Sequence, residues 1–483
     1  MVEISNKKIA QGIGWTTVST IVNGLTQILR LSILARFLDK SDFGIVAILT
    51  FILGLTQVFS DLGFSAAIMS EKKLSANRFL NLFWLQLITY VSLMFVMSLA
   101  SPLIADYYND EALILLVPIM LSELLFVGIG KLYDTVLQKN IQFKTIAIRN
   151  ICASVISLLF AVVLAIIGLG VYSLVISTVL NAIIVNIWNF IAGQKTYKLH
   201  IVRVDFKGTK DLIKVGIYQM GTQMLDYLSS KLDIILISSF LGVSDLGIYN
   251  LAKEIVLKFV LIINSIVNKV MLPVLSYNSD NITNLRNAFF AFIDNITIIN
   301  APIVGFVFLF SPEIVRLFYG SGYEEADSIV RILSIWSLFV VLGQPNGLIA
   351  ITIKRTDLTF IYTIIRLAFM SVFLYLFARY SLVSAALTML TTYLCMFFVS
   401  WFMLLKRTVN IKLFDYLWSF LKTCISVSVV VFITKYICSF FNNEDIVVYY
   451  EMFFYWTLIV LYVIIFERRV STLLITLIKR KSI

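Results

Sequence analysis

The sequence has 483 residues, of which 60% are hydrophobic and only 14% are charged, and its mean hydropathy is +0.93. Soluble chains contain about 25% charged residues, so this composition excludes a soluble domain of ordinary kind. The net charge of +11 could suggest a nucleic-acid partner, but the Lys and Arg residues lie in short stretches between apolar windows, where they act as topology determinants. The composition therefore predicts an all-α polytopic membrane protein that does not bind nucleic acid.

Residues suited to metal or acid–base chemistry are scarce. The only histidine, His200, lies in a basic connector, and the four cysteines lie inside predicted helices without metal-ligand spacing. The chain has no Gly-Lys-Ser/Thr loop for binding ATP phosphates. The first apolar window, from Ile13 to Leu34, lacks the small-residue cleavage site of a signal peptide, so it is expected to remain as a helix. We expect no metal, no cofactor and no enzymatic activity.

Apolar windows of about 20 residues, enough to cross a bilayer, predict about 14 transmembrane helices. They are expected at 13–37, 43–63, 79–101, 112–130, 146–168, 171–193, 212–240, 246–275, 288–311, 328–352, 357–379, 381–405, 417–440 and 447–466. The longest connector, about Gln194 to Asp211, is too short to fold as a catalytic domain.

The connectors alternate in charge along the chain. One set is basic, with clusters such as Lys72, Lys73 and Arg78, or Lys195, Lys198, Arg203, Lys207 and Lys210. The other set is acidic, with clusters such as Asp106, Asp110 and Glu111, or Glu313, Glu324, Glu325 and Asp327. Positive residues favour the cytoplasmic side, so both termini are expected in the cytoplasm.

An internal repeat divides the chain. The pattern Phe-Leu-x-x-Ser-Asp-x-Gly-Ile begins at Phe37 and again at Phe240, a shift of 203 residues. Because six helices and a connector separate the copies, they are expected to be parallel and related by an axis along the membrane normal. We predict two pseudo-symmetric six-helix lobes, 1–205 and 206–408, followed by two further helices and a basic tail in 409–483.

The same shift aligns polar residues in the helix that precedes each copy. The first helix carries Thr16, Thr20, Asn23, Gln27 and Arg30 at helical spacing, and the equivalent positions are Gln219, Gln223, Asp226, Ser230 and Asp233. Hydrogen bonding between membrane helices explains neutral members of such a stripe. Charged members cost roughly 2.5–3.5 kcal/mol each at the bilayer centre, so they are expected to face a partner or a water-filled path.

Charged residues within the predicted helices suggest a cavity. We expect Arg30, Asn23, Gln27, Lys231, Lys253 and Lys258 to bind an anionic substrate such as a diphosphate, with Arg making forked contacts and Lys acting as a point charge. Asp61, Asp226 and Asp233 are expected to hold these cations apart, or to bind a proton or sodium ion during transport. Glu254 and Lys258 could instead pair along their own helix.

Other charges have less distinctive settings. Arg149 and Arg331 lie near helix ends, where they either reach the interface or face the cavity, and Lys422 and Lys435 are expected to reach the interface. Arg30 and Asp233 occupy equivalent positions with opposite charges. We therefore hypothesise that they approach one another in one access state and separate in the other.

Several ordered motifs resemble a known family. They are Gly-Ile-Gly-Trp15, the run from Ile33 to Gly44, Asp61-Leu-Gly63-Phe64, Met271-Leu-Pro273 and Pro312-Glu-Ile-Val-Arg316. In this order and spacing, over roughly residues 10–410, they resemble the polysaccharide transporter family of the multidrug/oligosaccharidyl-lipid/polysaccharide exporter superfamily. The likeness is greatest to its Wzx-type O-antigen and colanic-acid flippase branch.

The resemblance implies a flippase of the bacterial inner membrane. Such a protein would move undecaprenyl-diphosphate-linked oligosaccharides outward by alternating access between two lobes, for O-antigen (lipopolysaccharide), capsule or exopolysaccharide assembly. It would work with a polysaccharide polymerase and a chain-length regulator, and coupling to protons or sodium is compatible with it. The family has no strict site signature, so the site residues above rest on the charge argument alone.

Three other functions remain open. A peptidoglycan-precursor flippase has related chemistry, although the first helix carries a single central Arg30 rather than a basic cluster. A drug or cation antiporter would favour an acidic, aromatic cavity. A membrane enzyme acting on lipid-linked sugars would favour a large outer loop rich in Arg and His, which the sequence lacks.

Overall fold

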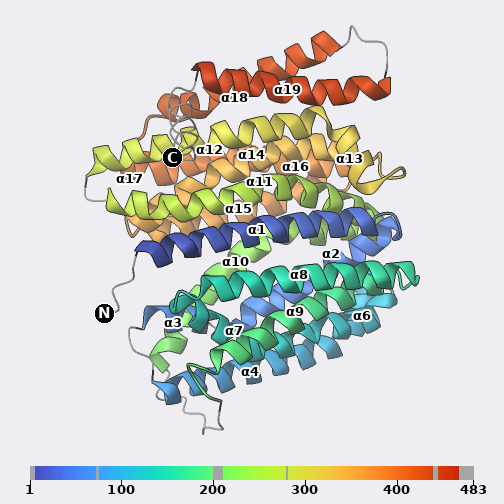
Figure 1. The fold of residues 1–483 in the computed structure, drawn as a ribbon, viewed down its shortest axis with the longest axis vertical. Helices are drawn as coiled ribbons and strands as arrows, with labels where there is room; N and C mark the ends of the chain where they lie inside the picture. Colours follow the sequence, from blue (N-terminus) through green and yellow to red (C-terminus); the bar gives the residue numbers. More distant parts are fainter. Residues whose placement is uncertain are drawn as a thin grey trace. The chain divides into compact units, whose positions relative to one another are not determined.

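The computed structural model describes residues 6–61, 63–71, 75–199, 210–278, 281–438 and 444–466. Side chains at some helical positions, Asp61 and Gln219 among them, lie outside this description. The described residues form helices and no strands, which confirms the all-α class (Figure 1). The basic connector that holds His200 and Lys207 lies outside the described residues.

The long helices of the first half lie at the predicted windows, but the window 112–130 extends to residue 139 as two helices, and the short helices at 64–70 and 101–108 were not predicted. They are α1 (Asn6–Leu34), α2 (Lys40–Asp61), α3 (Phe64–Ser70), α4 (Ala76–Leu99), α5 (Ser101–Tyr108), α6 (Ala112–Leu121), α7 (Glu123–Lys139), α8 (Phe143–Ile166), α9 (Val171–Gly193) and α10 (Lys210–Leu241). Local chemistry sets some of these bounds. The Ser75 hydroxyl, for example, accepts a hydrogen bond from the Arg78 amide at 3.3 Å and caps α4.

The second half continues in the same way. Its helices are α11 (Val243–Tyr277), α12 (Ile282–Leu309), α13 (Ser311–Tyr319), α14 (Ala326–Thr352), α15 (Thr356–Phe377), α16 (Leu382–Ser400), a π-helical turn (Trp401–Lys406), α17 (Arg407–Val409), α18 (Leu413–Cys438) and α19 (Glu444–Phe466). Within the described residues, ten helical spans are long and apolar enough to cross a membrane. The chain is thus a multi-pass membrane protein, and the count of 14 stays a prediction.

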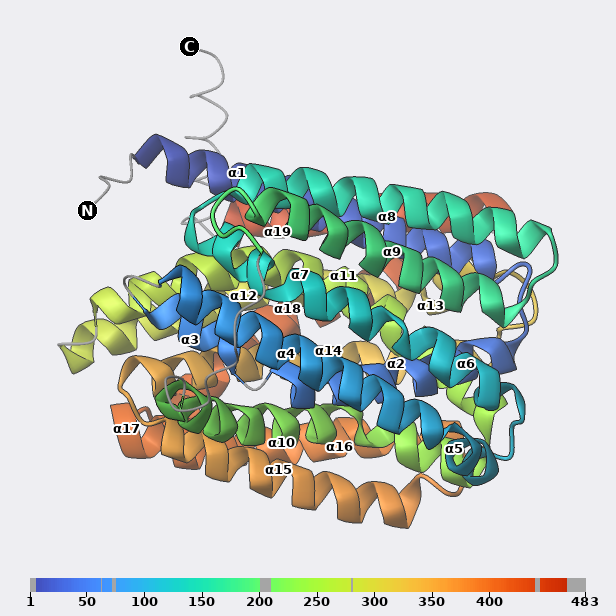
Figure 2. The same ribbon diagram turned by 90° about the horizontal axis from the view of Figure 1, so that it is seen from below.

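The helices gather into two compact units. The first comprises residues 1–251, 317–323 and 363–385, and the second comprises 252–316, 324–362 and 386–483. In the first unit, α8 lies between α1 and α9, and α9 packs on α7 (Figures 1 and 2). In the second unit, α12 packs against α14 and α18. The lobes predicted from the repeat, 1–205 and 206–408, remain a separate prediction.

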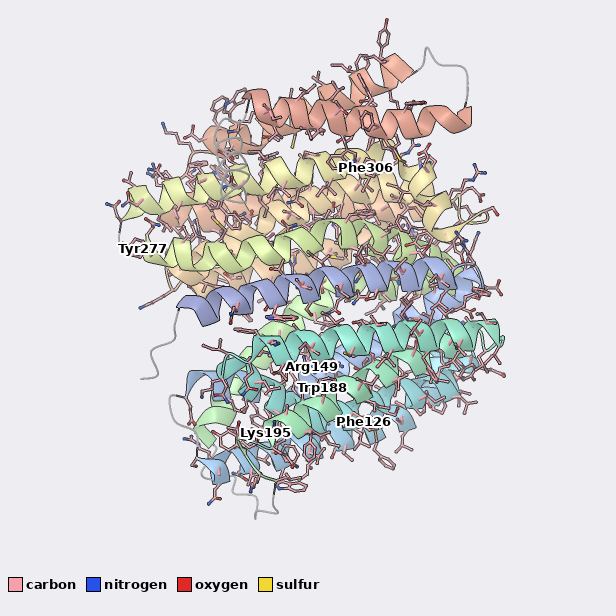
Figure 3. The ribbon with its side chains drawn as sticks, viewed as in Figure 1. Phe126, Arg149, Trp188, Lys195, Tyr277 and Phe306 are labelled. Atoms are coloured by element: carbon pink, nitrogen blue, oxygen red, sulfur yellow. The ribbon has the colours of Figure 1, made fainter. Side chains whose placement is uncertain are left out.

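Aromatic side chains join α12 to α19 in the second unit. The ring of Phe306, labelled in Figure 3, lies 6.0 Å from that of Tyr455 and 5.6 Å from that of Trp456. The Tyr455 hydroxyl of α19 donates to the Pro302 carbonyl of α12 at 2.7 Å. Pro302 lies inside α12 and has no backbone N–H to donate within the helix. The last helix is therefore held by ring packing and a specific hydrogen bond.

The two copies of the repeat motif meet within the first unit. A Cβ atom on Gly44 of α2 would lie 1.9 Å from the carbonyl oxygen of Val243, and one on Gly247 of α11 would lie 1.8 Å from that of Lys40. Lys40 and Val243 are themselves related by the shift of 203 residues, so the contact is reciprocal. Only a residue without a side chain permits such an approach of two backbones.

Candidate functional site

The polar stripe of the first helix lines a cavity. Three of the predicted substrate-binding residues, Asn23, Gln27 and Arg30, border a cavity of about 460 Å³ in the first unit. The other lining residues come from α1, α8 and α9, and they are Thr26, Asn150, Ser154, Ser157, Thr178, Asn181 and Val185. Arg30 is the one charged side chain among the described residues of this lining. The cavity therefore combines one cation with neutral amides and hydroxyls.

The guanidinium of Arg30 is bound to α9. Its Nη2 lies 2.6 Å from the Leu174 carbonyl oxygen, 2.7 Å from the Ser177 hydroxyl and 2.8 Å from the Thr178 hydroxyl. Its Nε is buried without a hydrogen-bond acceptor among the described residues, which also provide no carboxylate partner in an ion pair. A positive charge that neutral groups hold in place remains available to attract an anion.

Hydrogen bonds between hydroxyl and amide groups join the α8 wall of the cavity to α1 and to α9. The Ser154 hydroxyl of α8 donates to the Asn23 amide oxygen at 2.7 Å, and the Asn181 amide of α9 donates to the Ser157 hydroxyl at 3.3 Å. Such groups both donate and accept hydrogen bonds, so they are suited to binding sugar hydroxyls.

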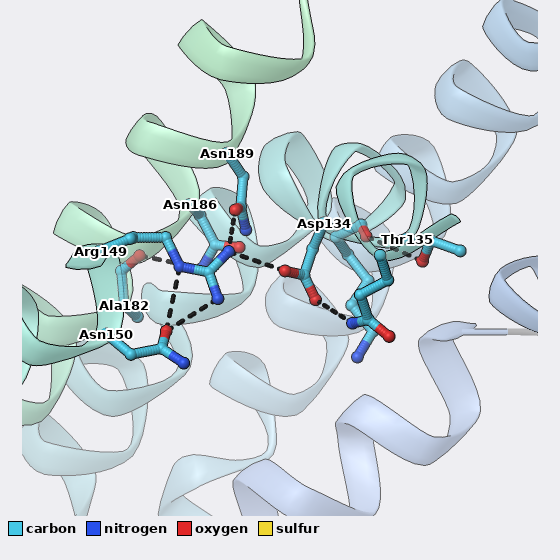
Figure 4. A network of polar contacts seen from close by, with 9 residues as sticks. Asp134, Thr135, Arg149, Asn150, Ala182, Asn186 and Asn189 are labelled. Atoms are coloured by element: carbon cyan, nitrogen blue, oxygen red, sulfur yellow. Dashed lines mark hydrogen bonds and ion pairs between the residues drawn. The ribbon is translucent and has the colours of Figure 1, made fainter. Parts of the chain in front are cut away.

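A buried arginine supports the α8 wall. Arg149, expected near a helix end, is 4% exposed, and its Nη1 forms an ion pair with Asp134 of α7 at 2.7 Å (Figure 4). The same nitrogen donates to Asn189 of α9, while Nε and Nη2 donate to the Asn150 amide oxygen at 3.0 and 2.8 Å. Arg149 thus neither reaches the interface nor lines the cavity, but it orients Asn150, which does.

The predicted acidic residues have partners of their own. Asp226 of α10 pairs with Arg366 of α15 at 2.5 Å, and Arg366 also donates to the Ser229 hydroxyl at 2.8 Å. Asp233 is fully buried and accepts a hydrogen bond from the Tyr249 hydroxyl at 2.8 Å. The partners found for Arg30 and Asp233 come from α9 and from Tyr249, and the hypothesised gate between the two charges remains a prediction.

The predicted lysines are divided between the units. Lys231 of α10 belongs to the first unit and is half-buried. Lys253 and Lys258 of α11 belong to the second, where Lys253 lies 5.6 Å from the centre of the Trp336 ring and Lys258 pairs with Glu254 at 3.2 Å. The pair of Lys258 with Glu254 is the alternative that their i,i+4 spacing had suggested. The side chain of Asp61 lies outside the described residues.

Lys422 has a partner that the sequence did not predict. Its ammonium lies 3.1 Å from a carboxylate oxygen of Asp294, which gives an ion pair between α18 and α12, while its approach to the interface stays a prediction. Sequence reasoning also missed Ser177 and Thr178 as partners of Arg30. Their hydroxyl-rich helix could have suggested a polar wall, but only the packing of α1 and α9 identifies which wall Arg30 contacts.

The comparison with protein families identifies the chain. The sequence pattern of the family described as "Polysaccharide biosynthesis protein" matches residues 33–328. The chain belongs to this family. The resemblance inferred from the motifs is thereby confirmed.

Individual relatives agree with this assignment. The teichuronic acid biosynthesis protein TuaB of Bacillus subtilis (strain 168) is 28% identical over 354 residues, covering 73% of each chain. The lipopolysaccharide biosynthesis protein WzxC of Escherichia coli (strain K12) is 22% identical over 362 residues, covering 74% of this chain and 73% of the relative.

A solved structure shares the fold. The lipid II flippase MurJ in its inward closed conformation superimposes with a TM-score of 0.76 at 16% identity, covering 94% of this chain and 99% of MurJ. At this identity the likeness concerns the fold alone.

Within the described residues, no group of three or more His, Cys, Asp or Glu side chains could hold a metal ion.

Proposed function

We propose that this membrane transporter is a flippase for lipid-linked oligosaccharides. The single observation that carries the proposal is the cavity lined by α1, α8 and α9, where Arg30 is held by neutral partners among amides and hydroxyls. A diphosphate-linked sugar presents both an anion and many hydroxyl groups. In the lining, Arg30 can bind the anion, and the amides and hydroxyls can hydrogen-bond to the sugar hydroxyl groups.

The names of two sequence relatives point to surface polysaccharides. TuaB and WzxC are named for the biosynthesis of teichuronic acid and lipopolysaccharide. We infer that the cargo of this chain is an undecaprenyl-diphosphate-linked unit, moved across the bacterial inner membrane for surface polysaccharide assembly. Alternating access between two six-helix lobes, cytoplasmic termini and cooperation with a polymerase and a chain-length regulator belong to this proposal.

In this scheme the predicted residues act in three groups. Asn23, Gln27 and Arg30 contact the head group, and Lys231, Lys253 and Lys258 attract its charge at later stages of the passage. Asp61, Asp226 and Asp233 act in coupling or gating. The pairing of Asp226 with Arg366 supports this role, because an ion pair inside the membrane provides two discrete arrangements, closed and open.

The fold likeness to MurJ makes a peptidoglycan-precursor flippase the second candidate. Against it, the described cavity contains one cation, Arg30, rather than several. Competition between two lipid-linked substrates, one with a neutral oligosaccharide and one with the peptidoglycan-precursor head group, separates these candidates.

The first prediction is that charge removal at Arg30 slows flipping strongly. Arg30→Gln keeps a side chain that can contact the α9 hydroxyls but lacks the charge for the diphosphate, so transport into proteoliposomes should fall at least about tenfold, corresponding to about 1.4 kcal/mol. Arg30→Lys should retain part of the activity because the charge remains.

The matched control is Arg379→Gln, which removes an exposed arginine beside Tyr380. This variant should flip the lipid like the unmodified protein, and both should be present at equal amounts in the membrane. Normal transport by Arg30→Gln would remove the cavity from the mechanism, and failure of the unmodified protein to flip any lipid-linked oligosaccharide would reject the function.

A further inference from the structure

The helix that spans residues 112–139 is interrupted near its middle. It consists of α6 and α7, which are separated at Ser122. Pro118, one turn earlier, lacks an amide hydrogen and so breaks the regular ladder. The Ser122 hydroxyl donates to the Ile119 carbonyl at 2.6 Å, beside the break. Interruptions of this kind inside a membrane are tolerated where neighbouring helices or polar groups satisfy the freed backbone.

A carboxyl group follows the interruption directly. Glu123 is the first residue of α7, and its Oε1 accepts a hydrogen bond from the Gln57 amide of α2 at 3.3 Å. Its Oε2 is buried without a hydrogen-bond partner among the described residues, which also form no ion pair with it. The carboxyl therefore has one neutral partner and one oxygen to spare.

Charged groups on the helices packed around α6 and α7 lie away from this carboxyl. Lys40 and Asp42 occupy the first turn of α2, and Arg78 occupies that of α4, whereas Glu123 and Gln57 lie far along their spans. α9 carries no Asp, Glu, Lys or Arg, and the side chain of Asp61, at the end of α2, is outside the described residues. On α8, Arg149 pairs with Asp134 of α7 and Lys144 lies over the Trp15 ring. On α7 itself, Lys139 donates to the carbonyls of Ile68 and Glu71, and Lys131 lies about two turns beyond Glu123. Asp106 lies near the end of α5, and no ion pair between described residues includes Glu123.

An ionised carboxylate in such a setting is costly. Burial of a charge without a partner is unfavourable by several kcal/mol, and the usual outcome is that the group takes up a proton instead. A protonated carboxyl also satisfies its own spare oxygen, since its O–H can donate while the other oxygen still accepts from Gln57. The neutral acid is the form that fits this structure.

We propose that Glu123 and Gln57 form a proton-binding site at the break between α6 and α7. In the state shown, one carboxyl oxygen of Glu123 holds the proton. When the helices move and water reaches the carboxyl, that O–H bond breaks, the proton passes to water, and the carboxylate is left hydrated. The use of this exchange to drive transport rests on the proposed flippase function, whereas the binding of the proton does not.

Infrared spectroscopy of the full-length protein in lipid tests the binding. At neutral pH, the difference spectrum of the unmodified protein minus Glu123→Gln should contain the carbonyl band of a protonated carboxylic acid. The matched control is Glu111→Gln, an exposed residue just before α6, whose difference spectrum should contain carboxylate bands instead. A carboxylate signature for Glu123 would overturn the proposal.

A second variant covers the case in which Glu123→Gln does not fold. Gln57→Leu removes the one hydrogen-bond partner that the described residues give this carboxyl, and the acid band should then shift in frequency. An unchanged band would show that the acid lies elsewhere, which would also overturn the proposed site.

Transport in proteoliposomes tests the use of the proton. An imposed pH gradient should accelerate flipping by the unmodified protein, whereas Glu123→Gln should flip at the same rate with and without it. An equal response of both proteins to the pH gradient, or a response of the unmodified protein to sodium alone, would contradict the coupling. If no lipid is flipped by the unmodified protein, the proposed function fails while the infrared result still stands.

Discussion

At the scale of the residue, buried cations in this protein differ by the partners that they find. Arg149 meets a carboxylate and two amides, and so it is structural. Arg30 meets a carbonyl and two hydroxyls, which leave its charge uncompensated. Arg149 therefore stabilises the fold, whereas Arg30 is suited to binding an anion. The difference lies in the groups that accept their hydrogen bonds, which, among the described residues, include a carboxylate only at Arg149.

Loss of Arg149 should destabilise the first unit strongly. Arg149→Met leaves the Asp134 carboxylate, 18% exposed, without its cation, and breaking a buried pair costs about 3–5 kcal/mol. A large fall in the thermal unfolding temperature in detergent is expected. The double variant Arg149→Met/Asp134→Asn should recover part of that loss because no unpaired charge remains.

The exposed ion pair between Arg355 and Asp357 provides the comparison. Arg355→Met should leave the unfolding temperature unchanged, since exposed pairs contribute little to stability. Equal effects of Arg149→Met and Arg355→Met would show that the network in Figure 4 does not stabilise the protein.

At the scale of the element, the crossing of α2 and α11 depends on glycine. Gly44 and Gly247 each admit the backbone of the other helix, at positions related by the repeat. Substitution by alanine should force the two helices apart and cost about 1–3 kcal/mol for each site. The effects of Gly44→Ala and Gly247→Ala should not add, because the first substitution already separates the helices.

Gly14 of α1 is the matched control for this prediction. A Cβ atom there would have no neighbour within 4 Å, so Gly14→Ala should be neutral or raise stability by up to about 1 kcal/mol through its better helix propensity. Thermal unfolding of the three variants measures the difference. Tolerance of alanine at both Gly44 and Gly247 would mean that the crossing is loose in the membrane.

At the scale of the whole molecule, the charge of the connectors predicts the orientation in the membrane. Basic connectors are expected on the cytoplasmic side, and acidic ones on the outside. In a variant without the native cysteines, an impermeant thiol reagent applied from outside should modify a cysteine at position 324 and spare one at position 207. The reverse pattern would invert the topology, and labelling of both would indicate a leaky preparation, which an internal control must exclude.

Hydropathy and helical period are local properties, so the class of the protein, the positions of most of its long helices and the polar stripe of α1 could be predicted from the sequence. The family could also be inferred from the sequence, because its motifs occur in this chain in the same order and at similar spacing. The lining of the Arg30 cavity was predictable from α1 only, where Asn23, Gln27 and Arg30 share one face. Its other walls were not predictable.

Which polar groups contact one another depends on how the helices pack. Arg30 with Thr178, Asp226 with Arg366, and Glu123 with Gln57 are pairs from distant parts of the chain. Each pair depends on how two helices are rotated and how closely they pack, and no single helix encodes the rotation of its neighbour. The cost of a charged side chain inside a membrane depends on the group that it contacts. The role of each charged residue could therefore be assigned only once its partner was known.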